Sequence, residues 1–167
     1  MAEAVKERAT AVISQLADTI AKRTSAACVD EEKFFHELVN VLPAAVYTTD
    51  GAGRITYFNE AAVELWGCRP ELGRSEWCGS WKLFWPDGRR MPHDQCPMAV
   101  AVKERRSVRG FDAVAERPDG TRISFIPFPT PLFSSDGQFI GAVNLLGRID
   151  IHLSQIMAAA RAVKPAK

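Results

Sequence analysis

The stretch Leu42–Gly67, LPAAVYTTDGAGRITYFNEAAVELWG, decides the fold class of this chain. Its segments Ala45–Thr49 and Ile55–Phe58 contain the β-branched and aromatic residues that favour strands. Between them, Asp50–Gly53 supplies the positive φ angles that a short hairpin requires. The stretch therefore predicts two strands joined by a tight turn.

A short helix is expected directly after this hairpin. Asn59 is a favourable N-cap residue, and Glu60 places a negative charge in the first turn, where the helix dipole favours it. Gly67 suits the end of the helix because glycine adopts the left-handed conformation at low cost. Local chemistry thus predicts the order strand, turn, strand, helix.

The same stretch carries an ordered pattern of apolar, turn and capping residues. The pattern consists of Leu42, Pro43, Tyr47, Asp50, Gly53, Ile55, Phe58, Asn59, Ala61, Ala62, Trp66 and Gly67. It resembles the opening of the PAS sensory domains of bacterial signalling proteins, and the resemblance extends to about Asp150. The resemblance implies an α+β fold, with a five-stranded antiparallel sheet, helices over one face and a cavity that can hold a small-molecule ligand.

Size and composition fit a globular domain with extensions. The chain has 167 residues, of which 47% are hydrophobic and 25% charged, so that one core can be buried. A net charge of +1 gives no electrostatic reason to expect a nucleic-acid partner. We expect no membrane partner and a cytoplasmic location, because no apolar run approaches about 20 residues and the N-terminus lacks the order of a secretory signal.

We expect three regions: an N-terminal helical extension at 1–39, a PAS domain at 40–150, and a C-terminal helix with a short basic tail at 151–167. A narrow apolar seam in the first region consists of Ala9, Ile13, Leu16 and Ile20. Such a seam either packs on its own domain or pairs with a second copy. Because a helix of this kind mediates dimerisation before many PAS domains, the resemblance favours a homodimer.

The segment Arg69–Asp94 is rich in tryptophan and interrupted by proline and glycine. It should therefore lack a long helix or strand, and in PAS domains the corresponding region holds short helices that cover the cavity. Pro86–Gly88 predicts a turn, and Pro97 begins a helix that ends near Arg106. The aromatic residues expected to be buried by this segment are Trp77, Trp81, Phe84 and Trp85.

Three strands are expected in the second half of the chain, at Val108–Arg117, Thr121–Phe133 and Phe139–Asp150. The middle strand contains Pro127, Pro129 and Pro131, which lack N–H groups on the same edge. We expect this deficient edge to face Val108–Arg117, with pairing that ends near Pro127 and a complete ladder on the other edge.

The expected cavity combines aromatic, methionine and aliphatic side chains from the covering segment, the helix and the sheet. The residues expected to line it are Trp66, Phe84, Met98, Val102, Phe111, Phe125 and Asn144. Asn144 is the polar residue in an apolar strand, and its alternative role is that of a buried amide with satisfied hydrogen bonds.

Reactive side chains come together in sequence at His93 and Cys96. The spacing Cys68-x9-Cys78-x14-His93-x2-Cys96 does not resemble a zinc site, and no base or basic cluster identifies Cys96 as a nucleophile. A small thiol-dependent enzyme is therefore the least favoured alternative, and we expect free thiols. A partly exposed loop histidine beside a buried structural cysteine is the simplest interpretation.

Haem binding through His93, or through Cys96, is the alternative that the resemblance suggests. In oxygen-sensing PAS domains the axial histidine lies about 17 residues before a glycine on the next strand, and Gly110 has this offset from His93. Against this, Pro92 and Pro97 place His93 in a loop or a first turn, where a rigid axial ligand is harder to hold.

The function expected from the resemblance is signal sensing or protein–protein regulation, without catalysis. A change in the pocket would shift the sheet and its flanking helices. No transmitter segment follows residue 150, so the output is expected to pass to another protein, such as a kinase or regulator, unless the chain belongs to a longer one. In the family, the last strand usually ends in an acid-Ile-Thr junction to the output helix, but this chain has Arg148–Asp150 there. This difference weakens the expectation that the signal leaves by the usual route.

Overall fold

The computed structural model describes residues 36, 39, 40, 42 and 44–149 of the chain. The expected dimer seam and the expected C-terminal helix lie outside these residues. Of the N-terminal extension, His36 and Val39 are described, and both are helical, as is Asn40 after them. The divisions at residues 39 and 150 therefore stay predictions.

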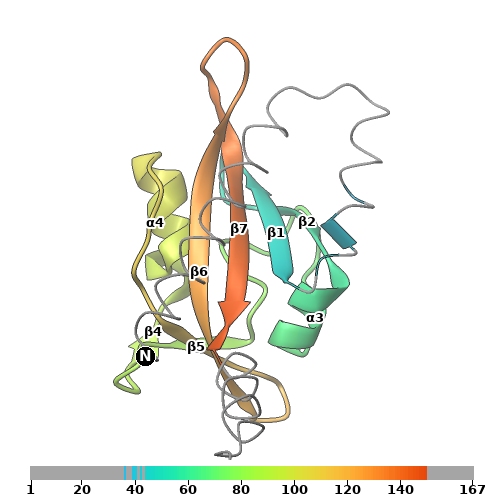
Figure 1. Ribbon diagram of the computed structural model, residues 1–167, viewed down its shortest axis with the longest axis vertical. Coiled ribbons are helices and arrows are strands. Elements are labelled where there is room, and N and C mark those ends of the chain that lie inside the picture. The colour runs from blue at the N-terminus through green and yellow to red at the C-terminus, as the bar shows by residue number, and fades with distance from the viewer. Residues whose placement is uncertain (1–35, 37–38, 41, 43, 150–167) are drawn as a thin grey trace, which may run out of the picture.

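Within the described residues, seven strands form one antiparallel sheet in the order β2-β1-β7-β6-β5-β3-β4 (Figure 1). The strands are β1 (Ala45–Asp50), β2 (Ile55–Phe58), β3 (Lys82–Phe84), β4 (Arg90–Met91), β5 (Ala113–Glu116), β6 (Arg122–Phe133) and β7 (Phe139–Arg148). The helices with defined bounds are α3 (Glu60–Trp66), the 3₁₀ turn η1 (His93–Gln95) and α4 (Pro97–Glu104).

The α+β class is confirmed, but the expected count of five strands is wrong. The additional strands, β3 and β4, form a short hairpin that extends the sheet beside β5. Its turn closes where the sequence predicted one, since the Trp85 N–H donates to the Arg89 carbonyl over 2.9 Å. Strands of three and two residues are too short to produce an alternating pattern, which is why the sequence indicated only a loop.

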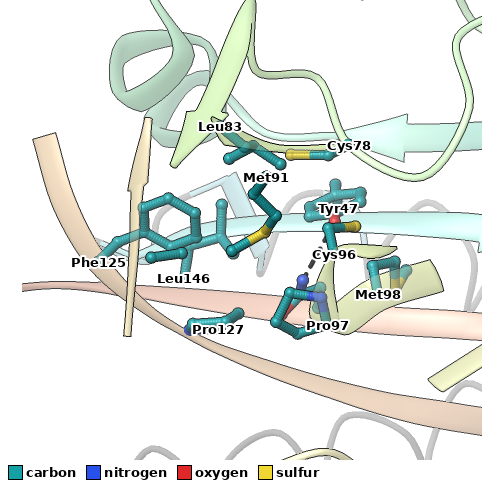
Figure 2. Close-up of a pocket in the computed structure, with 12 residues that line it drawn as sticks. Tyr47, Cys78, Leu83, Met91, Cys96, Pro97, Met98, Phe125, Pro127 and Leu146 are labelled. Atoms are coloured by element: carbon teal, nitrogen blue, oxygen red, sulfur yellow. Dashed lines mark hydrogen bonds between the residues drawn. The ribbon is translucent and has the colours of Figure 1, made fainter. Parts of the chain in front are cut away.

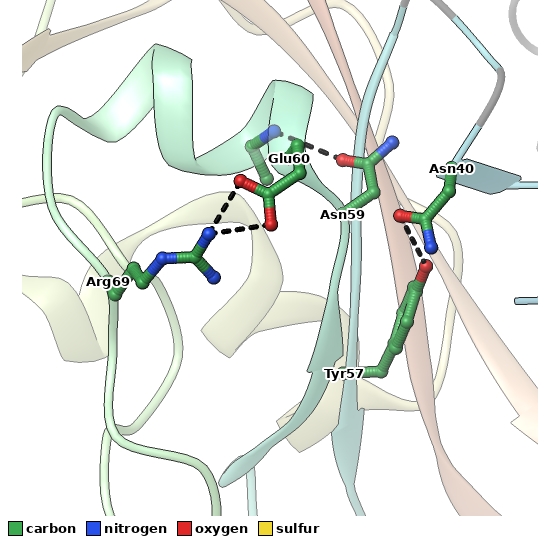
Figure 3. Close-up of polar contacts among 6 residues, drawn as sticks. Asn40, Tyr57, Asn59, Glu60 and Arg69 are labelled. Atoms are coloured by element: carbon green, nitrogen blue, oxygen red, sulfur yellow. Dashed lines mark hydrogen bonds and ion pairs between the residues drawn. The ribbon is translucent and has the colours of Figure 1, made fainter.

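The opening stretch folds as predicted. The Asp50 side chain accepts hydrogen bonds from the N–H groups of Ala52 and Arg54 and so fixes the β1–β2 turn. Helix α3 begins at Asn59, whose side chain accepts from the Ala62 N–H over 3.0 Å (Figure 3), and it ends at Gly67 with φ of 70°. Both ends of the helix are thus set by local chemistry.

Asn59 also connects elements that lie far apart in the sequence. Its Oδ1 atom accepts from the Val46 N–H over 2.9 Å, and its Nδ2 atom donates to the carbonyls of Val39 and Ala44 over 3.0 and 2.8 Å. Nearby, the Tyr57 hydroxyl donates to Oδ1 of Asn40 over 3.2 Å (Figure 3). The chain entering the sheet is therefore held to β1 and α3.

The two faces of the sheet carry separate cores. On one face, α3 packs on β1 and β5, and α4 packs on β6 and β7, around buried Trp66 and Met98. On the other face, Phe128, Val143 and Leu145 are fully buried together with Val39. No described helix is long and apolar enough to span a membrane.

The proline-rich strand β6 is paired as predicted. Its register with β5 runs from Glu116↔Arg122 to Ala113↔Phe125 and stops there, whereas its register with β7 continues to Phe133↔Phe139. Strand β5 begins at Ala113, later than the predicted Val108, because the preceding residues cross the unpaired edge instead of forming a ladder. There the Val108 N–H donates to the Pro129 carbonyl over 3.2 Å.

The covering segment Arg69–Asp94 contains turns, the β3–β4 hairpin and, at its end, the start of the 3₁₀ turn η1; of the short helices that the resemblance implied, only this turn is present. Trp77 and Trp85 are partly buried against the core, as expected. Trp81 was expected to be buried but is 57% exposed; it lies just before β3, outside the strand.

Candidate sensory pocket

A small void lies between the first face of the sheet, the covering segment and the start of α4 (Figure 2). Its walls are formed by Tyr47, Cys78, Leu83, Met91, Cys96, Pro97, Met98, Ala113, Phe125, Pro127, Asn144 and Leu146. The centre of a water-sized sphere can occupy about 10 Å³ of it, which is room for about one water molecule.

Different elements bring these side chains to the void. Tyr47 from β1 and Asn144 from β7 are opposite partners in the sheet register. Met91 reaches the void from β4, and Cys96 is the N-cap residue of α4. Cys78 follows Trp77, whose φ of 66° lies in the left-handed region that bulky residues rarely adopt.

The unusual backbone of Trp77 is stabilised by its neighbours. Its N–H donates to the Gly53 carbonyl over 2.8 Å, and its ring lies so close to Gly53 that an added Cβ would approach it to 2.2 Å. The Lys103 ammonium lies 5.2 Å from the centre of the same ring, in cation–π geometry. Trp77 thereby connects the covering segment to the β1–β2 turn and to α4.

A chain of three hydrogen bonds borders the void. The Phe128 N–H of β6 donates to Asn144 Oδ1 over 2.9 Å, and Asn144 Nδ2 donates to the Tyr47 hydroxyl over 3.1 Å. The Tyr47 hydroxyl in turn donates to the Trp77 carbonyl over 2.8 Å. The amide of Asn144 is therefore satisfied at both ends, which matches the alternative role expected for it.

The thiols beside the void are protonated at neutral pH. Burial raises the pKa of Cys96 to about 12 and raises that of Cys78 as well. Burial, together with the negative charges that Cys78 and Cys96 would carry as thiolates, also places the pKa of Tyr47 well above its usual value. Cys68, Cys78 and Cys96 are free thiols, and this chemistry does not favour a cysteine nucleophile.

The structure brings together three of the seven residues expected to line a cavity. Met98, Phe125 and Asn144 border the void. Trp66 and Val102 are buried elsewhere in the same core, and the Phe84 ring is in cation–π contact with two arginines, Arg90 and Arg122. Phe111 is 45% exposed, because it lies in the segment before β5. Ligand binding by these residues stays a prediction.

His93 lies in the 3₁₀ turn η1, in agreement with the loop or first turn expected from its flanking prolines. Its Nε2 atom is 2.8 Å from the Ser80 carbonyl oxygen, and it does not border the void. Cys96 does border it, but the space is that of about one water molecule. These residues do not fit a haem group.

Sequence reasoning missed Tyr47, Cys78 and Met91 as lining residues. Tyr47 belongs to the opening pattern, and the alternation of β1 could have placed it on the helix-covered face. For Cys78 and Met91, no local signal was available, because an irregular loop and a two-residue strand carry no measurable periodicity.

Comparisons with known proteins identify the fold. The family model of the PAS domain matches residues 33–104, and no curated protein matches the chain. The PAS domain of the fruit-fly ELK potassium channel is similar, with a TM-score of 0.56 and 10% identity over 74% of this chain and 98% of that one.

Two further solved structures are PAS domains, one from Colwellia psychrerythraea and one of an HTR-like protein from Haloarcula marismortui. Each is 17% identical with a TM-score of 0.49, covering 72% of this chain and 98% or 93% of its own. Residues 33–104 thus match the family model of the PAS domain, and the chain shares the fold of the potassium-channel PAS domain.

Proposed function

We propose that this chain is a signal-sensing and regulatory module that responds to a small ligand or partner and passes a conformational change to another protein. PAS domains are typically sensory or signalling modules, and no enzyme family matches the chain. The observation that carries the proposal is the hydrogen-bond chain from Phe128 through Asn144 and Tyr47 to Trp77. A change in the void would alter these bonds directly, because Tyr47 and Asn144 border it.

The geometry supports a route from the void toward the N-terminal extension. Tyr47 faces the void, and the N–H of the preceding residue, Val46, is bonded to Asn59. Asn59 also holds the carbonyl of Val39, in the helical residues that precede the sheet. A displacement of β1 would therefore move the residues at which the extension joins the domain.

The experiment fills the void with a larger side chain and measures amide exchange at residues that lie away from the substitution. Ala113→Val adds two methyl groups to a residue that borders the void, and Ala115→Val is its matched control on the same strand, buried but away from the void. We expect amide exchange at Val46, Phe128 and Val39 to change in the first variant only. In a Tyr47→Phe background the same filling should no longer change exchange at Val39.

A response confined to residues touching position 113 would contradict the proposal. Equal responses in the two alanine variants would do so as well, because they would reflect general strain in the core. Thermal unfolding of each variant, compared with the unaltered chain, shows whether the domain is still folded before exchange is interpreted.

A homodimer joined through residues 9–20 is the second part of the proposal, with a cytoplasmic kinase or regulator as the downstream partner. The seam is too short to hold a coiled coil alone, so surfaces of the domain are expected to contribute. Changing both Ile13 and Leu16 to Asp should give a folded monomer by light scattering. If the unaltered chain is already monomeric, or the variant remains dimeric, the seam belongs to packing within one chain.

A further inference from the structure

Four sulfur-containing side chains border the void, Cys78 from a loop, Met91 from β4, and Cys96 and Met98 from the start of α4. All four are buried, with exposed fractions of 8% or less. Figure 2 shows the sulfur atoms of Cys78, Met91 and Cys96 around the same space between the sheet and α4. Apolar packing alone does not require sulfur atoms, so the presence of two thiols and two thioethers around one void points to a further role for them.

We propose that the void binds one soft monovalent metal ion of the copper(I) class, through the thiolates of Cys78 and Cys96 and the thioethers of Met91 and Met98. Thiolate and thioether ligands select copper(I) over the harder divalent ions. Among the described residues, no group of three or more His, Cys, Asp or Glu is placed to hold a metal ion. The donor set thus favours a soft ion over zinc.

The size of the void points to the same class of ligand. Its free space of about 10 Å³ accepts about one water molecule, so a single ion enters where an organic molecule would have to displace the core. The other walls are largely apolar, including Leu83, Phe125 and Leu146. Such walls exclude water and leave the sulfur atoms as the main ligands for an ion.

Binding replaces two protons by one ion. Both thiols lose their protons to solvent, four sulfur–copper bonds form, two to thiolates and two to thioethers, and the charge of the site changes from zero to −1. Copper stays in the +1 state, so no oxidant or reductant takes part.

This inference deepens the proposed function by naming the class of ligand, and its consequence rests on that function. Tyr47 borders the void together with Cys78 and Cys96, and its hydroxyl belongs to the hydrogen-bond chain described above. A negative charge beside the neutral Tyr47 hydroxyl attracts its proton, in competition with the Trp77 carbonyl that accepts it in the metal-free protein. Metal occupancy would therefore act on the Tyr47 hydroxyl within that chain.

The test is a titration of the reduced full-length protein with copper(I) under nitrogen, in competition with the chromogenic chelator bathocuproine disulfonate. We expect one copper(I) per chain. Cys78→Ser and Cys96→Ser should each weaken binding at least about tenfold, and Met91→Leu and Met98→Leu should weaken it less, by analogy with the range found for altered metal surroundings. X-ray absorption of the loaded protein should show sulfur neighbours.

Cys68→Ser is the matched control. Cys68 lies in the same region, and its thiol donates to the Gly79 carbonyl over 3.3 Å, but it does not border the void. Its substitution should leave copper affinity unchanged. Where a serine variant fails to fold by thermal unfolding without metal, the corresponding alanine variant replaces it, because alanine buries no new hydroxyl group.

Three results would overturn the inference: copper(I) lost completely to the chelator, binding that survives in the Cys78→Ser/Cys96→Ser double variant, or equal weakening by Cys68→Ser. Its failure is distinguishable from failure of the proposed function. If copper does not bind while Ala113→Val still changes exchange at Val39, the sensing proposal stands and the ligand class is wrong. If copper binds without any change at Val39, the site is present but does not signal.

Discussion

The two edges of strand β6 are paired with their neighbouring strands to different extents. Toward β7, the register is regular from Phe125↔Arg148 to Leu132↔Gly141 and, after a shift of one residue, ends at Phe133↔Phe139. Toward β5, four pairs form and the last of them is Ala113↔Phe125. The strand is central in the sheet, yet from Phe125 to Phe133 only its β7 edge carries a ladder.

The position of the prolines explains this asymmetry. Pro127, Pro129 and Pro131 alternate, so the edge without N–H groups is always the same one. That edge still offers carbonyls, and Pro129 accepts from the Val108 N–H and, over 2.8 Å, from the Arg109 guanidinium. Because the prolines lack N–H donors, the pairing of β6 with β5 ends beside the void. Beyond that point, the Arg109 side chain takes the place of a neighbouring strand as the partner of the β6 carbonyls.

The largest effect is expected from breaking the complete edge. Thr130 has the same parity as Phe128, so its N–H faces β7, and Thr130→Pro removes it from the ladder. This should cost about 3 kcal/mol or more in the free energy of unfolding, measured with urea. The control Pro131→Ala, on the edge that lacks a ladder, should change it by about 1 kcal/mol or less. Equal losses in both variants would refute the asymmetry.

A smaller loss of stability is expected on replacing Asn144, whose side chain accepts a hydrogen bond from the β7-facing edge of β6. Asn144→Leu leaves the buried Phe128 N–H without its acceptor, which should cost about 1–3 kcal/mol. In the unaltered protein we expect Ile126, Phe128 and Thr130 to be protected from amide exchange. In the variant, Phe128 should lose more protection than the other two, and rapid exchange at all three in the unaltered protein would show that β6 has left the sheet by Pro127.

Removing Arg109, which covers the edge of β6 that lacks proline N–H groups, should lower the free energy of unfolding by less than the two changes above. Arg109 donates to the Pro129 carbonyl and to the Thr130 hydroxyl, each over 2.8 Å, and water can replace part of these bonds in Arg109→Met. We expect a loss of about 1 kcal/mol in the free energy of unfolding. Arg106→Met, which removes an exposed ion pair with Glu104, is the control and should change little. A loss near that of Thr130→Pro would mean that the two edges are equally important.

The smallest effect concerns the short ladder between β5 and β6. Hydrogen bonds from Lys82 and Arg122 hold the pKa of Glu116 below its usual value. A carboxyl group with a lowered folded-state pKa stabilises the fold above its unfolded pKa and loses that contribution as pH falls through the lowered value. The difference in melting temperature between the unaltered protein and Glu116→Gln should therefore shrink on acidification from about pH 7 to about pH 3. A constant difference would show that the ion pairs are not its cause.

The sequence by itself determined the features that depend on neighbouring residues. The Asp50 turn, the Asn59 cap and the Gly67 end of α3 each follow from side chains within a few positions. The proline parity is local as well, and it predicted which edge of β6 would be incomplete and where pairing would end. These predictions hold because backbone geometry alone decides where an N–H group points.

Only the tertiary structure decided the added β3–β4 hairpin and the composition of the void. Tyr47 and Asn144 are bonded although they are 97 positions apart, and the four sulfur atoms come from a loop, a two-residue strand and the start of a helix. The predicted lining residues were chosen by type, and four of the seven lie elsewhere. Proximity of such residues depends on how the sheet and the covering segment pack, which no local pattern of the chain encodes.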